Sequence, residues 1–70
     1  MKYHYLFYYK TKINPDEQKC KSVVTDYEVD EAAALFLNST GFSKNNYLEI
    51  TGVKLDAKTG KELSKITLLS

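Results

Sequence analysis

Arginine is absent from this sequence, and all ten of its basic residues are lysine. A lysine ammonium cannot form the planar, two-pronged contact by which arginine reads guanine or holds a phosphate, so sequence-specific recognition of nucleic acid is disfavoured. The lysines nearly balance nine acidic residues, and a net charge of +1 gives no bulk field that attracts nucleic acid or an anionic membrane. The lysine-only usage, with many tyrosines and asparagines, indicates an AT-rich genome such as that of a phage, a mobile element or a low-GC bacterium.

Cysteine is almost as scarce: Cys20 stands alone, so the chain cannot form an internal disulfide. A lone cysteine favours a reducing compartment, and we expect the protein in the cytoplasm. Long apolar runs are absent too, so we expect no membrane span and no membrane partner. The apolar N-terminal run contains His4 and ends in Lys10 and Lys12, which is not the pattern of a secretory signal peptide.

The residues that carry enzyme chemistry are also few. Cys20 and His4 are the one cysteine–histidine pair in the sequence, and the hairpin predicted below separates them by roughly 20 Å, far beyond hydrogen-bond reach. The sequence has no CxxC or HExxH spacing for a metal, and its glycines are too dispersed for a phosphate loop. We therefore predict a non-enzymatic protein with no catalytic residue, no metal and no cofactor.

What the sequence does have is an aromatic stretch near its start, Lys2–Lys12 (KYHYLFYYKTK). Aromatic side chains favour strands, and the alternation of a strand gives this one two apolar faces. One face carries Tyr3, Tyr5, Phe7 and Tyr9, and the opposite face carries His4, Leu6 and Tyr8. A strand that is apolar on both sides is either covered twice or has one face that awaits a partner.

The second predicted strand, Lys19–Glu28, returns antiparallel to the first after a turn that contains proline. Cross-strand charges favour a register that places Lys2 opposite Glu28 and Leu6 opposite Val24. A register shifted by two residues also avoids like-charge pairs, so both registers stay open.

A short helix is predicted over Ala32–Asn38, with Asp30 as its N-cap and Gly41 as its stop. Four side chains at helical spacing are expected to face a sheet: Ala32, Ala33, Phe36 and Leu37. We expect Phe42 to cap the same core after the turn.

A second hairpin is predicted from Tyr47–Leu55 and Lys61–Leu69, with Gly60 closing the turn in the left-handed conformation. Pairing Leu55 with Lys61 makes one face of this hairpin apolar and the other polar.

Gly52 lies in the middle of the first strand of this hairpin. A glycine at such a position marks either a bulge or a close approach of the helix.

The predicted order is β-β-α-β-β, a single α+β domain over residues 1–70 with a mostly antiparallel four-stranded sheet and one helix packed on one face. The aromatic strand is expected near the centre, because a two-sided apolar strand at an edge invites aggregation. The order of the other strands stays open. A domain this small is marginally stable, which favours dimerisation or binding.

Exposed tyrosines favour a protein interface, since each buries a large area at low entropic cost. The sequence predicts a site for a protein partner, either a second copy in a homodimer or a host protein, formed by Tyr3, Tyr5, Tyr8, Tyr9, Tyr27 and Lys10. In size, element order and composition the chain resembles the small accessory proteins of phages and mobile elements, several anti-CRISPR proteins among them. That resemblance implies an inhibitor of a host protein.

The alternative function is non-sequence-specific binding of single-stranded nucleic acid. Aromatic and basic side chains on an open sheet face stack bases and contact phosphates. The same tyrosines would act with Lys2, Lys10, Lys12, Lys19 and Lys21. The near-neutral charge weakens this alternative, because phosphate contacts supply most non-specific affinity.

Overall fold

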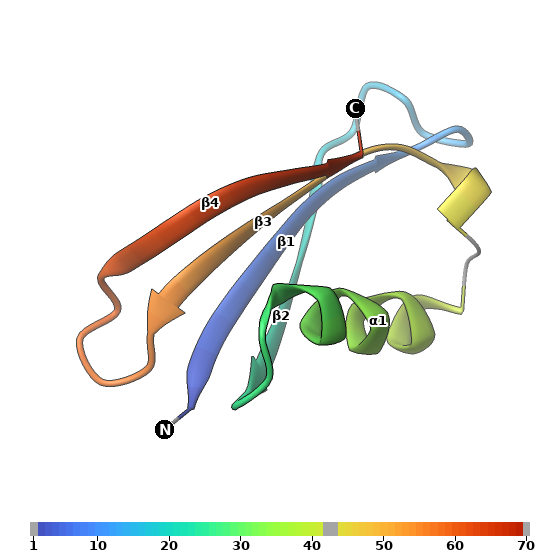
Figure 1. Ribbon diagram of the computed structural model, residues 1–70. Helices are drawn as coiled ribbons and strands as arrows, with labels where there is room; N and C mark the ends of the chain where they lie inside the picture. The colour runs from blue at the N-terminus through green and yellow to red at the C-terminus, as the bar shows by residue number, and fades with distance from the viewer. Residues whose placement is uncertain (1, 42–43, 70) are drawn as a thin grey trace.

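The computed structural model describes residues 2–41 and 44–69. These residues form one antiparallel sheet of four strands and a single α-helix, in the order β-β-α-β-β. The elements are β1 (Tyr3–Thr11), β2 (Lys19–Thr25), α1 (Val29–Thr40), the 3₁₀ turn η1 (Lys44–Asn46), β3 (Tyr47–Asp56) and β4 (Glu62–Leu69). The strands lie side by side as β2-β1-β3-β4, and α1 lies against one face of the sheet (Figure 1). The predicted fold class is confirmed.

The aromatic strand β1 is central, as predicted, with β2 on one side and β3 on the other. Side chains on the two faces of β1 differ in how deeply they are buried. Tyr5 and Phe7 are fully buried in the core that α1 covers, whereas Leu6 and Tyr8 on the opposite face are half-buried. The helix therefore covers one face of β1 and leaves the other face uncovered.

The first hairpin pairs in neither of the two predicted registers. Leu6 lies opposite Ser22 instead of Val24, and β2 ends at Thr25, whose hydroxyl accepts a hydrogen bond from the Tyr27 N–H at 3.2 Å. Shifts of two residues leave every side chain on its own face, so the apolar pattern cannot choose between them. The choice then rests on cross-strand charge pairs, and each is worth only about 0.2–1 kcal/mol.

The helix α1 begins at Val29 with Glu28 as its N-cap, so the predicted N-cap Asp30 is wrong. The Glu28 carboxylate does not cap the helix and instead accepts a hydrogen bond from Lys54 Nζ at 3.3 Å. Asp30 lies in the first turn, where its charge still complements the helix dipole. The C-terminal end is as predicted: Gly41 adopts the left-handed conformation with φ 73°.

The core lies between α1 and the sheet and is largely aromatic. Phe36 is fully buried, with its ring centroid 4.9 Å from that of Phe7, 5.2 Å from that of Tyr9 and 5.8 Å from that of Tyr47. The four helix side chains predicted to face the sheet are buried or packed against this core: Ala32, Ala33, Phe36 and Leu37. The expectation for Phe42 lies outside the described residues.

The second hairpin also differs from its predicted register. Leu55 pairs with Glu62 instead of Lys61, and the pairing of β3 with β4 shifts again between Lys54 and Leu55 and between Ile50 and Thr51. The turn explains the first shift, since the backbone N–H of residue 56 donates to the carbonyl oxygen of residue 61 at 2.9 Å and closes the loop one residue later on β3 than expected. The left-handed glycine of that turn, at residue 60, is confirmed with φ 73°.

The stability of the fold is expected to fall above about pH 10. The Tyr5 hydroxyl donates a hydrogen bond to the Tyr27 carbonyl oxygen at 2.8 Å. Burial raises the pKa of Tyr5 above its ordinary value of 10.0, against the opposing charge of Lys54. The pKa of Lys54 is raised as well: burial lowers it, but the hydrogen bond to Glu28 and the neighbouring negative groups outweigh that effect.

Both groups hold their protons more tightly in the folded chain than in the unfolded chain. The stability that they contribute is therefore complete below the unfolded pKa and is lost as the pH rises through the folded pKa. Urea unfolding at a series of pH values from about 8 to 11 checks this, with a falling midpoint expected above pH 10 and a shallower fall in a Tyr5→Phe variant. A midpoint that stays level across the series would contradict the expectation.

Candidate functional site on the uncovered face of the sheet

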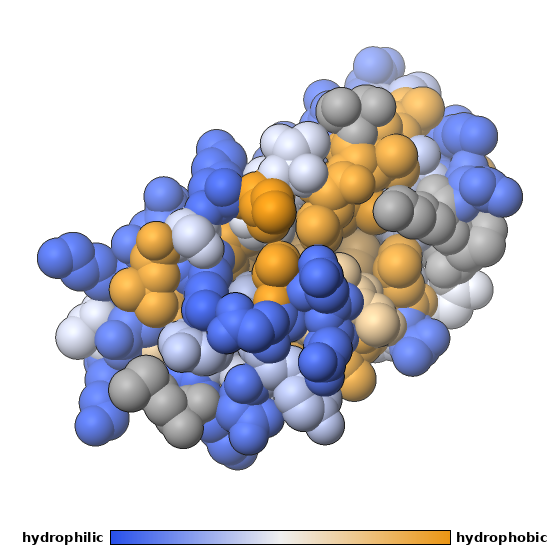
Figure 2. Space-filling view, in the orientation of Figure 1, coloured by the Kyte–Doolittle hydropathy of each residue, from blue (hydrophilic) through white to orange (hydrophobic). Residues whose placement is uncertain are grey.

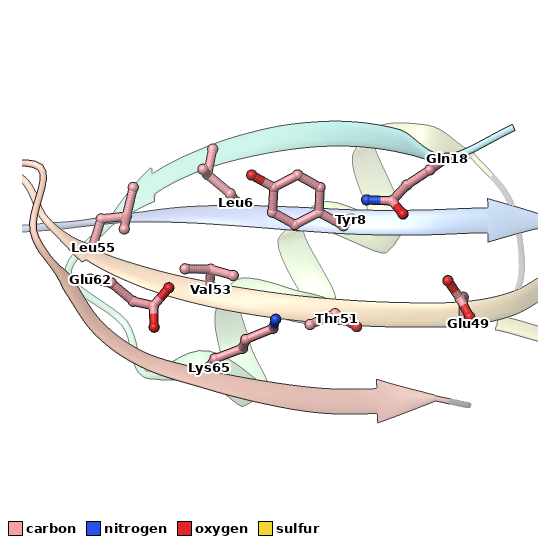
Figure 3. A pocket seen from close by; sticks show the side chains of 9 residues that line it. All are labelled: Leu6, Tyr8, Gln18, Glu49, Thr51, Val53, Leu55, Glu62 and Lys65. Atoms are coloured by element: carbon pink, nitrogen blue, oxygen red, sulfur yellow. The ribbon is translucent and has the colours of Figure 1, made fainter.

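The surface of the sheet opposite α1, called the open face from here on, is hollowed. The hollow has a volume of about 460 Å³. Its apolar floor is formed by Leu6, Tyr8, Val53 and Leu55. Thr51 lies among these floor residues on β3, and the polar rim is formed by Gln18, Glu49, Glu62 and Lys65 (Figure 3). An apolar centre surrounded by polar side chains is the usual anatomy of a protein interface.

Strand alternation and register assemble this floor. In the ladder between β1 and β3, Leu6 lies opposite Val53 and Tyr8 lies opposite Thr51, so side chains two residues apart on each strand share the open face. Val53 is only 6% exposed although no helix covers it. The neighbouring side chains therefore shield the floor themselves, and an occupant of the hollow would rest on a surface that is already well packed.

The turn between β3 and β4 brings Glu62 to this face. In the predicted register Glu62 would lie opposite Lys54, which points to the helix side with Gly52. The turn closes on residues 56 and 61, one residue later on β3, and so places Glu62 opposite Leu55 instead, on the open face. Sequence reasoning missed this residue because it closed the turn on Leu55 and Lys61, which places Glu62 on the helix side.

The rim carries side chains of both charges. Lys10 Nζ lies 3.9 Å from Glu49 Oε1, and both side chains are a third to a half exposed, so this pair contributes little to stability. Neither of the ion pairs found among the described residues involves Glu62 or Lys65. Both of these side chains extend from β4 toward β3 at the edge of the hollow (Figure 3).

The six residues predicted to bind a partner do not form one surface. Tyr8 and Lys10 lie on the open face, whereas Tyr3, Tyr5 and Tyr9 lie on the helix side of β1 and pack in or against the core. Tyr27 is 48% exposed, beyond the end of β2. The prediction combined both faces of β1 into one site, although alternation alone separates Tyr8 from its neighbours.

The helix-side tyrosines have structural roles instead. The Tyr3 ring lies beneath the Lys54 ammonium, with Nζ 3.8 Å from the ring centroid. Tyr9 packs against Phe36 and Tyr47. A variant of either tyrosine would therefore alter folding as well as any binding.

A smaller hollow of about 240 Å³ lies on the helix side, between α1 and β4. Figure 2 shows apolar side chains gathered there, among them Ala33, Leu37, Ile50 and Leu68. All four belong to the core or pack against it. This hollow is the margin of the core, where a single helix, roughly 10 Å wide, is narrower than four strands spaced about 4.8 Å apart.

The chemistry-bearing residues remain apart. His4 lies opposite Val24 and Cys20 lies opposite Tyr8, so four ladder positions, or about 13 Å, separate them. That is closer than predicted but still far beyond hydrogen-bond reach. No group of three or more histidine, cysteine or acidic side chains placed to hold a metal occurs in the described part of the chain.

No helix within residues 2–41 and 44–69 has the length and apolar character needed to cross a membrane. The fold and the open face together define a small α+β domain with one covered and one uncovered sheet surface. Comparison with protein-family models, with curated proteins and with solved structures finds no match to this chain.

Proposed function

We propose that this chain is a non-enzymatic binding domain that recognises another protein through the open face of its sheet. The observation that carries the proposal is the hollow itself, on the side of the sheet that α1 does not cover, with apolar residues in its floor and an exposed lining that is more polar than apolar. A protein partner would remove Leu6, Tyr8 and Leu55 from water, and burial of apolar surface is the main driving force of association. The mixed charges of the rim would then set specificity more than affinity.

The arrangement of aromatic and basic residues favours a protein over single-stranded nucleic acid. Base stacking needs several aromatic rings along one surface, and Tyr8 is the ring that lines the hollow. Lys19 and Lys21 pair with Tyr9 and Phe7, so their side chains belong to the other face of the sheet. Lys19 and Lys21 therefore do not join Tyr8 and Lys10 in a common track for a phosphate backbone.

The biological setting is part of the same proposal. The size and element order resemble those of the small phage and mobile-element proteins that block host proteins, and we place this chain in that class, acting in the cytoplasm on a host protein. A homodimer that uses the same face is the competing arrangement. Oligonucleotide binding that falls steeply with salt is the signature of the nucleic-acid alternative.

A pair of matched lysine variants tests the proposal. Thr51→Lys places a charge in the middle of the hollow, and Asn38→Lys adds the same charge at an exposed helix position away from it. We expect Thr51→Lys to weaken the partner complex by about tenfold or more, equivalent to at least roughly 1.4 kcal/mol, and Asn38→Lys to leave it unchanged. The partner is captured from the native host with all three proteins, and its affinity is then measured by titration of the purified components.

Circular dichroism melts keep the comparison valid by showing that both variants fold. Light scattering of the protein alone reports self-association. Equal binding by the folded Thr51→Lys variant and the wild type would show that the open face is not the site. If the protein binds oligothymidine more tightly than any protein, and salt weakens that binding steeply, the nucleic-acid alternative replaces the proposal.

A further inference from the structure

The hollow matches a short α-helix in length and width. Glu49 and Leu55 are six residues apart on β3, which is about 20 Å at strand rise. Glu62 lies opposite Leu55, so the carboxylates of Glu49 and Glu62 mark the two ends of the hollow (Figure 3). About 13 helical residues span the same length. The hollow with its rim reaches from β1 across β3 to β4, two strand spacings or about 10 Å, which is close to the diameter of a helix.

A second copy of this chain does not fit the hollow. Two open faces in contact would set one concavity against the other and leave both unfilled. Insertion of α1 from another copy would be a head-to-tail contact that does not close into a dimer. In addition, α1 already packs its apolar side, which includes Ala32 and Phe36, against its own sheet.

The free charges of the rim define the chemistry of the occupant. Glu62 and Lys65 lie opposite Leu55 and Val53, two positions apart on β3, so the ladder separates them by about 7 Å. Side chains four residues apart on a helix are about 6 Å apart on one face. A helix over the hollow would thus bring a basic residue to Glu62 and an acidic residue to Lys65 one turn away.

We propose that the hollow receives an amphipathic helix of the partner protein. Its apolar stripe rests on Leu6, Tyr8 and Val53, and its flank over β4 carries a base and an acid one turn apart, facing Glu62 and Lys65. This inference rests on the proposed function, because it specifies which segment of a protein partner occupies the open face.

Zero-length carbodiimide coupling of the purified complex tests the inference, because it joins an amine to a carboxylate only where the two are in contact. The expected products join Lys65 to an acidic partner residue and Glu62 to a partner lysine three or four positions away in the same segment. The intrachain pair Lys54–Glu28, with its atoms 3.3 Å apart, is an internal positive control. Lys65→Gln should remove its own product and weaken binding about two- to fivefold, the range of an exposed ion pair.

The spacing of the coupled partner residues distinguishes the outcomes. Positions two apart would indicate an extended strand and would overturn the helix, while leaving the open face as the site. Coupling of Glu62 to Lys65 of a second copy would overturn the hetero-partner in favour of a homodimer. A complex that is lost in Thr51→Lys but gives no coupling at either residue would also overturn the helix, whereas a complex unaffected by Thr51→Lys removes the proposed function itself.

Discussion

Replacement of Phe36 by alanine is expected to destabilise the fold by about 3–5 kcal/mol, the usual cost of removing a fully buried phenylalanine ring. The ring is inaccessible to solvent and contacts the rings of Phe7, Tyr9 and Tyr47. A domain of this length has a total stability of roughly 4–10 kcal/mol. The substitution therefore removes a large share of the stability, and we expect a marginally folded chain at room temperature.

Urea unfolding followed by circular dichroism measures the loss. Leu35→Ala is the matched control, because it also removes an apolar side chain from the same helix. Leu35 directly precedes Phe36 but is 40% exposed. This control should cost less than about 1 kcal/mol, since less apolar surface is lost from a buried setting. A Phe36→Ala variant that unfolds at nearly the wild-type urea concentration would mean that α1 does not pack on the sheet as described.

The parts of the fold that the sequence predicts are those that depend on alternation and helical spacing. Tyr5 and Phe7 alternate with Leu6 and Tyr8, and this pattern alone requires a central strand with two apolar faces. The helical spacing of Ala32, Ala33, Phe36 and Leu37 requires a partner surface in the same way. Burial of the apolar side chains in such a pattern contributes several kilocalories per mole to stability, so the folded chain must bury them.

The registers of both hairpins were not predictable on these grounds. In the first hairpin, shifts by two residues preserve the faces and differ only in exposed charge pairs. In the second, Asp56 forms the closing pair of the turn because its Oδ1 accepts hydrogen bonds from the N–H groups of Lys58 and Thr59, at 2.8 and 3.2 Å. Those local bonds decide the loop length and thereby place Glu62 opposite Leu55 on the open face.

The candidate site, too, was predictable from the sequence only in part. The sequence indicates that β1 has a surplus apolar face, and Tyr8 and Lys10 do lie on it. The sequence does not show which of the two faces of β1 the helix covers. The predicted site therefore included tyrosines from both faces. The floor residues Val53 and Leu55 come from β3, and only the observed pairing of β1 with β3 joins them to Leu6. A site shared by strands that are neighbours in the sheet but not in the sequence depends on strand order, which local patterns do not encode.

Gly52→Val is expected to cost about 1–3 kcal/mol, the usual penalty for overpacking a filled core. A Cβ atom at residue 52 would lie 3.2 Å from Phe7 Cε1 and 3.6 Å from Val29 Cγ2. Val29 of α1 does approach this glycine, as predicted, but only to ordinary van der Waals contact, and the tight neighbour is Phe7 of β1. The alternative of a bulge is wrong, because the register shifts of β3 lie elsewhere. Phe7 is fully buried against Phe36 and has little room to yield.

The matched control is Thr51→Val, which introduces the same side chain one residue earlier on the other face of β3 and should change stability by less than about 0.5 kcal/mol. A double-mutant cycle with Phe7→Leu identifies the cause of the loss. The smaller side chain should accommodate part of the added valine, so the two losses together should be smaller than their sum by about 0.5 kcal/mol or more. Strict additivity would show that the valine does not press on Phe7, and that the glycine is needed for some reason other than this contact.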